Sequence, residues 1–158
     1  MKYAEIHIDL EPYLIKFVCT DVGTNNMRVN PQSELGIYVL KLLSFPPNTG
    51  WKTPRVRESR RLTLRISRHT LAEQRTGQYL SDDARLAIAR CITSLFWEKV
   101  NTEVMLRAIK YGQKEGQVLR KIKAMYDISE EDFKEESMGR RYRRWKQRFR
   151  IPMDTGVE

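Results

Sequence analysis

Residues 82–110 carry the longest periodic pattern in the chain. Their apolar side chains keep near-helical spacing over about eight turns. Ser81 precedes the segment as a helix cap, and Asp82 and Asp83 occupy the first turn, where acidic side chains complement the helix dipole. The pattern predicts one long helix as the backbone of the domain. Its apolar positions are Leu86, Ile88, Ile92, Leu95, Phe96, Val100, Val104 and Ile109.

Two segments before this helix alternate apolar and polar residues, as half-buried strands do. In residues 3–10 the apolar side chains fall at even positions, and in residues 62–67 Leu62, Leu64 and Ile66 alternate with polar or basic side chains. We expect a strand in each segment. Residues 27–29 form a shorter extended stretch.

Proline residues mark two further predicted helices. Pro12 suits the first turn of a helix that continues through Phe17 and Val18, with a second strand as the alternative. Asn30-Pro31 is interpreted as a cap followed by a proline at the first helical position. That second helix presents Leu35, Val39, Leu42 and Leu43 on one face and ends at the Pro46-Pro47 pair.

The C-terminal third predicts three helices. The first follows Gly112 and Gly116 and carries Leu119, Ile122 and Tyr126. Ser129, followed by three acids, is placed as the cap of a short helix to about Glu136. Residues 137–139 are interpreted as a turn before a final helix that runs to about Arg150. This order outlines a helix-turn-helix.

The predicted fold is therefore α+β and predominantly helical. It has a small β element with packed helices and a C-terminal helix-turn-helix-like three-helix unit. Residues 1–111 form the mixed α/β body, residues 112–150 the helical unit and residues 151–158 a tail. A chain of 158 residues is the size of one ordinary domain, with a core that needs neither disulfide nor metal.

The final helix combines a large apolar face with a pure basic face. Met138, Tyr142, Trp145 and Phe149 recur at steps of four, three and four residues. Like charges at such spacing repel one another in an isolated helix, and phosphate oxygens match the arginine fork. We therefore interpret the basic side chains as nucleic-acid contacts. They are Arg140, Arg141, Arg143, Arg144, Lys146, Arg148 and Arg150.

Two other interpretations of this helix stay open. The basic face can simply be solvated while the aromatic face packs on the body. The arginines can also pair with the acids of the preceding segment, which reduces the number of cations free for phosphate. Those acids are Glu130, Glu131, Glu135 and Glu136.

The net charge of +9 is concentrated in two blocks. Residues 51–80 hold eight basic and two acidic side chains, and residues 110–150 hold thirteen and seven, while the helix between them is neutral. In the first block Trp51 and Lys52 precede several arginines, an arrangement typical of an arm that enters a groove and equally of an exposed loop. The candidate contacts there are Arg55, Arg57, Arg60 and Arg61.

The sequence offers little for catalysis. His7 and His69 are the only histidines, and neither has a partner at metal-ligand spacing. No glycine-rich phosphate loop is present. The best enzyme case, a nuclease or recombinase, uses either a tyrosine nucleophile assisted by Arg68-His69 or acids that alternate along a strand edge. Solvent exposure is the simpler explanation for such acids. We expect no enzyme, no cofactor and no metal site. The acids are Glu5, Asp9 and Glu11, with Lys16 beside them.

Cys19 and Cys91 both sit in apolar stretches, which favours buried free thiols. Neither a signal peptide nor an uninterrupted apolar run of membrane-spanning length is found, so we expect a cytoplasmic protein without a membrane partner.

These features predict a DNA-binding protein, either a transcriptional regulator or an accessory factor of a phage or mobile element, with double-stranded DNA as its partner. One alternative is an RNA or single-strand binder that stacks bases on Trp51, Tyr142 and Trp145. Another is a protein–protein assembly module without nucleic acid. A homodimer along the long helix is a further expectation, although packing inside its own domain explains the same apolar positions.

Overall fold

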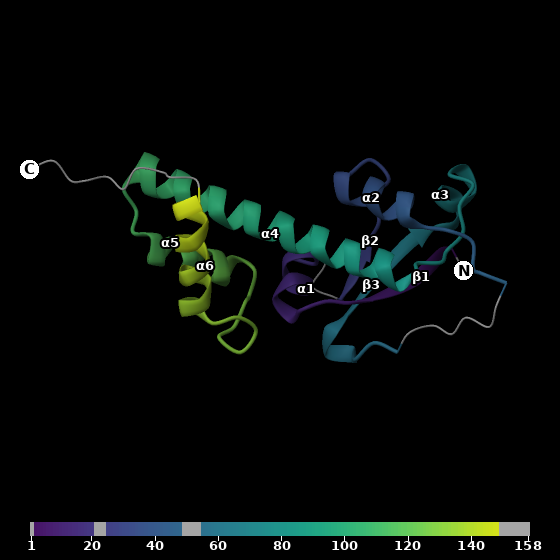
Figure 1. Cartoon of the computed structure of the whole chain (residues 1–158), viewed down its shortest axis with the longest axis horizontal. Helices are drawn as coiled ribbons and strands as arrows, with labels where there is room; N and C mark the ends of the chain where they lie inside the picture. Colours follow the sequence, from purple (N-terminus) through teal and green to yellow (C-terminus); the bar gives the residue numbers. More distant parts are fainter. Residues whose placement is uncertain (1, 21–24, 49–54, 149–158) are drawn as a thin grey trace, which may run out of the picture. The chain divides into compact units, whose positions relative to one another are not determined.

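The structure of the protein, a computed structural model, describes residues 2–20, 25–48 and 55–148. Within them the chain is α+β and mainly helical, with one small sheet, which confirms the predicted fold class. The chain divides into two compact units, Met1–Phe96 (unit 1) and Trp97–Glu158 (unit 2). The division falls inside the long helix α4 (Asp82–Tyr111), as the labels in Figure 1 allow the reader to follow.

Unit 1 is built on a three-stranded sheet with the order β1-β3-β2. β1 (Tyr3–Asp9) pairs antiparallel with β3 (Arg61–Ser67), and β2 (Asn26–Arg28) pairs parallel with β3. Ile6 lies opposite Leu64 in the register. The alternating segments of the sequence are therefore strands, as predicted. They bury one face because successive side chains point to opposite sides of a strand.

Helices pack on the apolar face of this sheet. The first half of α4 crosses the strands in Figure 1. α1 (Pro12–Val18) is a helix, so the alternative of a second strand there is wrong. The rings of Tyr13 and Phe17 both meet Phe96 edge-on, each at a centroid distance of 5.2 Å. Such pairs add about 0.5–1.5 kcal/mol to the burial of each ring.

α2 (Glu34–Leu42) begins later than predicted. Ser33 is its cap, because the Ser33 hydroxyl accepts a hydrogen bond from the Gly36 amide at 3.0 Å. Asn30 instead forms a turn of its own, accepting from the Gln32 amide at 2.9 Å. A Cβ on Gly36 would lie 1.7 Å from the Asn30 carbonyl oxygen, so only glycine permits this approach. The prediction of Asn30 as the cap is wrong.

Two short helical elements flank β3, and Ser81 and Arg85 fix the start of α4. A 3₁₀ turn, η1 (Glu58–Arg60), precedes β3, and α3 (Arg68–Glu73) directly follows β3. The Ser81 hydroxyl accepts from the Ala84 amide at 3.1 Å, which confirms the predicted cap of α4. Arg85, one turn further on, is buried and donates to the His7 carbonyl oxygen of β1. This contact ties the start of α4 to the sheet.

The apolar pattern of α4 is borne out at most of its positions. Ile88, Ile92 and Phe96 are fully buried in unit 1, and Val100 and Val104 are buried in unit 2. Two predicted positions are wrong, since Leu86 and Ile109 are 55% and 72% exposed. None of the described helices, α4 included, is both long and apolar enough to cross a membrane.

Unit 2 contains the second half of α4, α5 (Glu115–Met125) and α6 (Glu135–Arg148). α4 stops at Gly112, whose φ of +60° suits glycine. α5 ends in a Schellman motif: the Ile128 amide donates to the Lys123 carbonyl at 2.8 Å and the Asp127 amide to the Ala124 carbonyl at 3.2 Å.

The predicted short helix from Ser129 and the turn at residues 137–139 are both wrong. The Ser129 hydroxyl and amide both donate to the Asp132 carboxylate, at 2.8 and 2.7 Å, and close a turn instead. α6 then starts at Glu135 and continues through Gly139 without a break. The prediction of a short helix failed because a serine followed by acids is typical both of helix caps and of turns.

Candidate nucleic-acid interface

The start of α6 is fixed by Glu130. Its carboxylate accepts from the amide of Glu135, at 3.1 Å, and from the buried ammonium of Lys123. The hydrogen bond from Lys123 and then that from Glu135 hold the pKa of Glu130 below its ordinary value. The Glu130 carboxylate therefore accepts from the first amide of α6 and also pairs with the buried Lys123 ammonium. These two contacts fix the residue at which the basic helix begins.

The inner face of α6 anchors the helix in unit 2. Met138 and Tyr142 are buried, together with Val118 and Leu119 of α5. Tyr142 stacks on Trp145 with ring centroids 5.9 Å apart. Burial, with a smaller effect of the Glu115 charge, raises the pKa of Tyr142 to about 12. The aromatic stripe is thus mainly structural, and Phe149 lies outside the described residues.

Lys146 belongs to this anchoring rather than to the free basic face. Its ammonium donates to the Glu115 carboxylate at 2.6 Å and lies 5.7 Å from the centroid of the Tyr142 ring. A cation held by both a carboxylate and an aromatic face is less available to phosphate. Lys146, a predicted phosphate contact, therefore also connects α6 to α5.

The outer face of α6 and the second half of α4 border an open groove of about 520 Å³ within unit 2. Four of the predicted arginines come together there, and none of the described residues that line the groove carries a carboxylate. Arg143, although exposed on the same helix, is not among the lining residues. Trp97 and Asn101 of α4 line the groove together with Ser137, Arg140, Arg141, Arg144, Trp145 and Arg148 of α6.

The four arginines differ in how they are held. Arg140 donates to Glu136 at 2.5 Å, a pair of exposed groups on one helix worth at most about 0.5 kcal/mol. The Arg141 guanidinium lies 4.3 Å from the centroid of the Trp97 ring. Arg144 and Arg148 form no ion pair with any residue in the described ranges. The predicted pairing with the preceding acids thus occupies one arginine of the groove.

Asn101 is a groove residue that the sequence analysis missed. It is 5% exposed, and its side-chain oxygen has no hydrogen-bond partner within the described part of the chain. A buried polar atom without a hydrogen-bond partner lowers the free energy of unfolding by about 1–3 kcal/mol. The available signal was its place one turn after Trp97, where a polar residue interrupts the apolar positions of α4.

The other basic block belongs to unit 1. Arg60 donates to Asp9 at 2.7 Å and to Glu11 at 2.6 Å, and these bonds raise its pKa. Arg61 donates to the Val56 carbonyl at 3.0 Å. Two of the four predicted contacts in this block thus hold the local structure.

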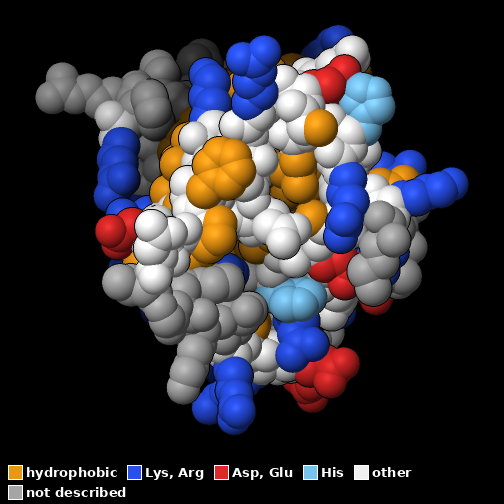
Figure 2. Space-filling model, turned by 90° about the vertical axis from the view of Figure 1, so that its right-hand side faces the viewer, with side chains coloured by type: hydrophobic (Ala, Val, Ile, Leu, Met, Phe, Trp, Pro, Cys, Tyr) orange, Lys and Arg blue, Asp and Glu red, His pale blue; other side chains and the backbone are white. Residues whose placement is uncertain are grey.

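The remaining two, Arg55 and Arg57, are exposed and form no ion pair among the residues described. Figure 2 views the molecule from the side where Figure 1 places the N-terminus, and it shows Lys and Arg side chains around exposed hydrophobic ones. Three predicted residues, Trp51, Lys52 and Arg150, lie outside the described residues.

The acids considered for catalysis are engaged in ion pairs. Asp9 and Glu11 both hold Arg60, and Glu5 accepts from Arg65 at 2.9 Å. His69 lies 3.3 Å from Glu73, one turn away on a short exposed helix. Within the described ranges no group of three histidine, cysteine or acidic residues is placed to hold a metal ion.

Comparison of the chain with protein-family models, curated proteins and solved structures gives no significant match.

Proposed function

We propose that the protein binds nucleic acid, with the arginine groove of unit 2 holding the phosphates. The observation that carries the proposal is the convergence of Arg140, Arg141, Arg144 and Arg148 on one groove, with no carboxylate among its described lining residues. Double-stranded DNA is the partner we favour, in keeping with a regulator or an accessory factor of a phage or mobile element.

The spacing of three of these arginines supports a phosphate ligand. Arg140, Arg144 and Arg148 follow one another at four-residue steps, which rise about 6 Å each along a helix. Successive phosphates of a strand have a similar separation. Without a ligand the like charges repel at this spacing, and arginine forks bind phosphate oxygens through paired hydrogen bonds. A polyanion thus relieves a repulsion that is built into α6.

A duplex can accept this helix without a helix-turn-helix, because the major groove of B-DNA is wide enough for one α-helix. Most contacts would then be to phosphates, which fix position and carry no sequence information. We therefore propose phosphate binding and no base readout.

A second candidate is a single strand of RNA or DNA, favoured by the two tryptophans and the amide that line the groove. Trp145 is half-buried, whereas Trp97 is 6% exposed and lies under Arg141. Stacking of a base on Trp97 would require Arg141 to move. The Asn101 amide offers a hydrogen-bonding group to an unpaired base.

The test is a set of binding titrations at several salt concentrations with duplex DNA, single-stranded DNA and RNA. For wild type the logarithm of affinity should fall linearly with the logarithm of salt, because each neutralised phosphate releases counterions. Arg144→Gln and Arg148→Gln should each lower the slope by about one. Arg143→Gln is the matched control, since it removes the same charge from the same helix outside the groove.

A flat salt response of the wild type would overturn the proposal. Equal losses for Arg143→Gln and Arg144→Gln would assign binding to net charge rather than to the groove. Tighter binding of single strands, lost in Trp145→Ala, would favour the second candidate. No binding to any of the three would leave the protein–protein assembly module.

A further inference from the structure

β1 has no strand partner on one side among the described residues. It is an edge strand, since the order of the sheet is β1-β3-β2. The Arg68 amide donates to the Lys2 carbonyl at 3.2 Å, and the Leu10 amide donates to the Arg60 carbonyl at 2.8 Å. Antiparallel ladders use alternate residues, so the even-numbered residues of β1 face β3.

The odd-numbered residues Tyr3, Glu5 and His7 therefore turn their amides and carbonyls away from the sheet. Of these outward groups, the His7 carbonyl accepts from Arg85. The backbone groups of Tyr3 and Glu5 have no hydrogen-bond partner within the described ranges. An exposed edge of this kind is a template for another strand.

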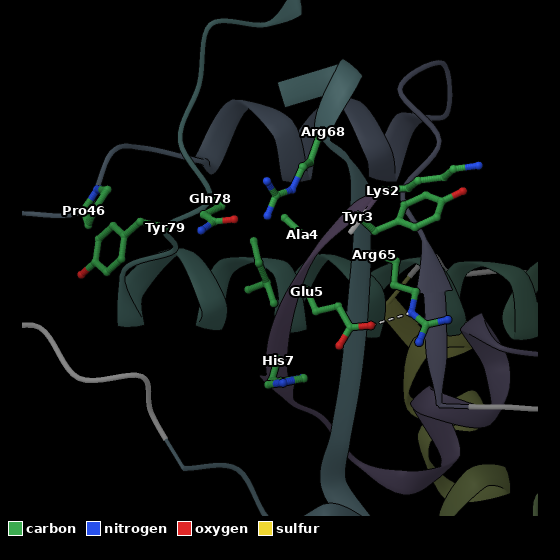
Figure 3. Close-up of a pocket in the computed structure, with 11 residues that line it drawn as sticks. Lys2, Tyr3, Ala4, Glu5, His7, Pro46, Arg65, Arg68, Gln78 and Tyr79 are labelled. Atoms are coloured by element: carbon green, nitrogen blue, oxygen red, sulfur yellow. Dashed lines mark hydrogen bonds and ion pairs between the residues drawn. The ribbon is translucent and has the colours of Figure 1, made fainter. Parts of the chain in front are cut away.

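A groove of about 630 Å³ runs along this edge within unit 1. Its lining includes six consecutive residues, 2–7. A hollow over one face of a strand touches alternate residues only, because successive side chains point to opposite faces. Six residues in a row therefore place the groove beside the backbone. Figure 3 shows β1 on one side of this space and Gln78 and Tyr79 on the other.

The far wall is held by its own hydrogen bonds. Ser44 and Tyr79 form an isolated antiparallel bridge, with each amide donating to the other's carbonyl at 3.0 Å. A Cβ on Gly77 would lie 2.2 Å from the Ser44 carbonyl oxygen, so the two segments are in close contact. The groove thus has two backbone walls, and the β1 wall carries the outward groups of Tyr3 and Glu5.

The charge of the lining selects the occupant. Lys2, Arg65 and Arg68 line the groove. Among the described lining residues Glu5 alone carries a carboxylate, and Arg65 already donates to it at 2.9 Å. Lys2 and Arg68 form no ion pair within the part of the chain described. Figure 3 shows the Arg68 guanidinium directed between Ala4 and Gln78, into the groove. An extended segment carrying a carboxylate complements this lining.

We propose that this groove binds an extended acidic peptide, which adds as a strand to the free edge of β1 and places a carboxylate on Arg68. Main-chain hydrogen bonds to Tyr3 and Glu5 provide affinity, and Arg68 provides the preference for an acid. Arg85 closes the edge at His7. The site is independent of the arginine groove in unit 2.

The probe is a capped, labelled peptide that alternates valine and threonine around a central glutamate. Its binding should slow amide hydrogen exchange at Tyr3 and Glu5. The same peptide with alternate amides N-methylated should not bind, because its strand edge is blocked. Arg68→Gln should weaken binding about tenfold, as expected for the loss of a charge-assisted hydrogen bond.

A pair of variants at Glu5 tests the edge itself. Glu5→Pro removes an outward amide but no hydrogen bond of the β1–β3 ladder, and proline is tolerated in edge strands. It should abolish binding, whereas Glu5→Ala, which keeps the amide, should not. The N-methylated peptide gives the same information if Glu5→Pro does not fold.

Three results would overturn the proposal. The first is equal binding of the N-methylated and unmodified peptides, and the second is no protection of the Tyr3 and Glu5 amides at millimolar peptide. The third is protection of the same amides by an oligonucleotide, which would assign the edge to nucleic acid.

Discussion

The ammonium of Lys146 lies 2.6 Å from the carboxylate of Glu115, and this ion pair joins the last turns of α6 to the first turn of α5. The side chains are 21% and 34% exposed, so solvent screens the pair only in part. Lys146, which the sequence predicts as a phosphate contact, therefore connects α6 to α5.

Lys146→Gln should lower the free energy of unfolding by about 1 kcal/mol, because it leaves a half-buried carboxylate without its partner. It should change the salt slope of nucleic-acid binding less than Arg144→Gln does. Urea unfolding and salt titrations measure the two effects. Lys121→Gln, an exposed lysine of α5, is the control for charge alone. A larger loss of slope for Lys146→Gln than for Arg144→Gln would contradict this assignment.

Gly139→Ala should stabilise the protein by up to about 1 kcal/mol, since glycine inside a helix is unfavourable relative to alanine. The added Cβ would meet Leu119 at 3.8 Å, an ordinary contact. Thermal unfolding measures the gain. Gly36→Ala is the opposite case and should destabilise through its clash with Asn30. A loss of stability in Gly139→Ala would contradict a continuous helix at this position and would favour the turn predicted from the sequence.

Acid should weaken unit 2 through Glu130. Its folded pKa lies below the ordinary value of 4.5, so its contribution to stability is present above that value and is lost as the pH falls through the folded pKa. Protonation also removes the charged acceptor of the buried Lys123, which then keeps its hydrogen bond to the Phe133 carbonyl. Urea unfolding between about pH 5 and pH 3 should show a steeper decline in wild type than in Glu130→Gln.

Glu131→Gln, which changes an exposed neighbour, should keep the wild-type pH dependence. Parallel pH profiles for wild type and Glu130→Gln would show that the carboxylate does not carry this effect.

Both thiols should react slowly in the folded protein. Burial raises the pKa of Cys19 to about 11, so about one molecule in a thousand is a thiolate at pH 8. Burial, and then the Glu34 charge, also raises the pKa of Cys91. A thiol-disulfide reagent should modify the buried Cys19 only after denaturant is added, and the half-buried Cys91 more slowly in the native protein than after denaturation. Cys19→Ser and Cys91→Ser assign each rate, and fast modification of native Cys19 would contradict its burial.

The sequence predicted those elements in which burial repeats with a fixed period. Ile6 and Ile8 alternate with polar neighbours, and Ile88, Ile92 and Phe96 recur at helical spacing, so strand and helix follow from the pattern alone. Element ends were less predictable because several residues compete to cap them. Ser33 and Asn30 stand three residues apart, and only the turn closed by Asn30 decides between them.

The candidate groove was predictable in its cations and not in its geometry. The run from Arg140 to Arg148 is visible in the sequence, but which of these side chains share a groove depends on the rotation of α6 against α4. The pairing of Arg60 with Asp9 and Glu11 joins residues about fifty positions apart, which no local pattern reveals. Asn101 interrupts the apolar positions of α4 in the sequence, but only the packing of α6 on α4 shows that it lines the groove.

The loop that follows α4 and the boundary between the two compact units lie at different residues. Gly112 ends α4, yet the compact units separate inside that helix, between Phe96 and Trp97. A fragment that starts at the loop would carry α5 and α6 without Trp97, which lies under Arg141, and without the buried Val100 and Val104. Any attempt to isolate the arginine groove must therefore cut the chain within the first half of α4, and the fragment must carry a free helix end as its new N-terminus.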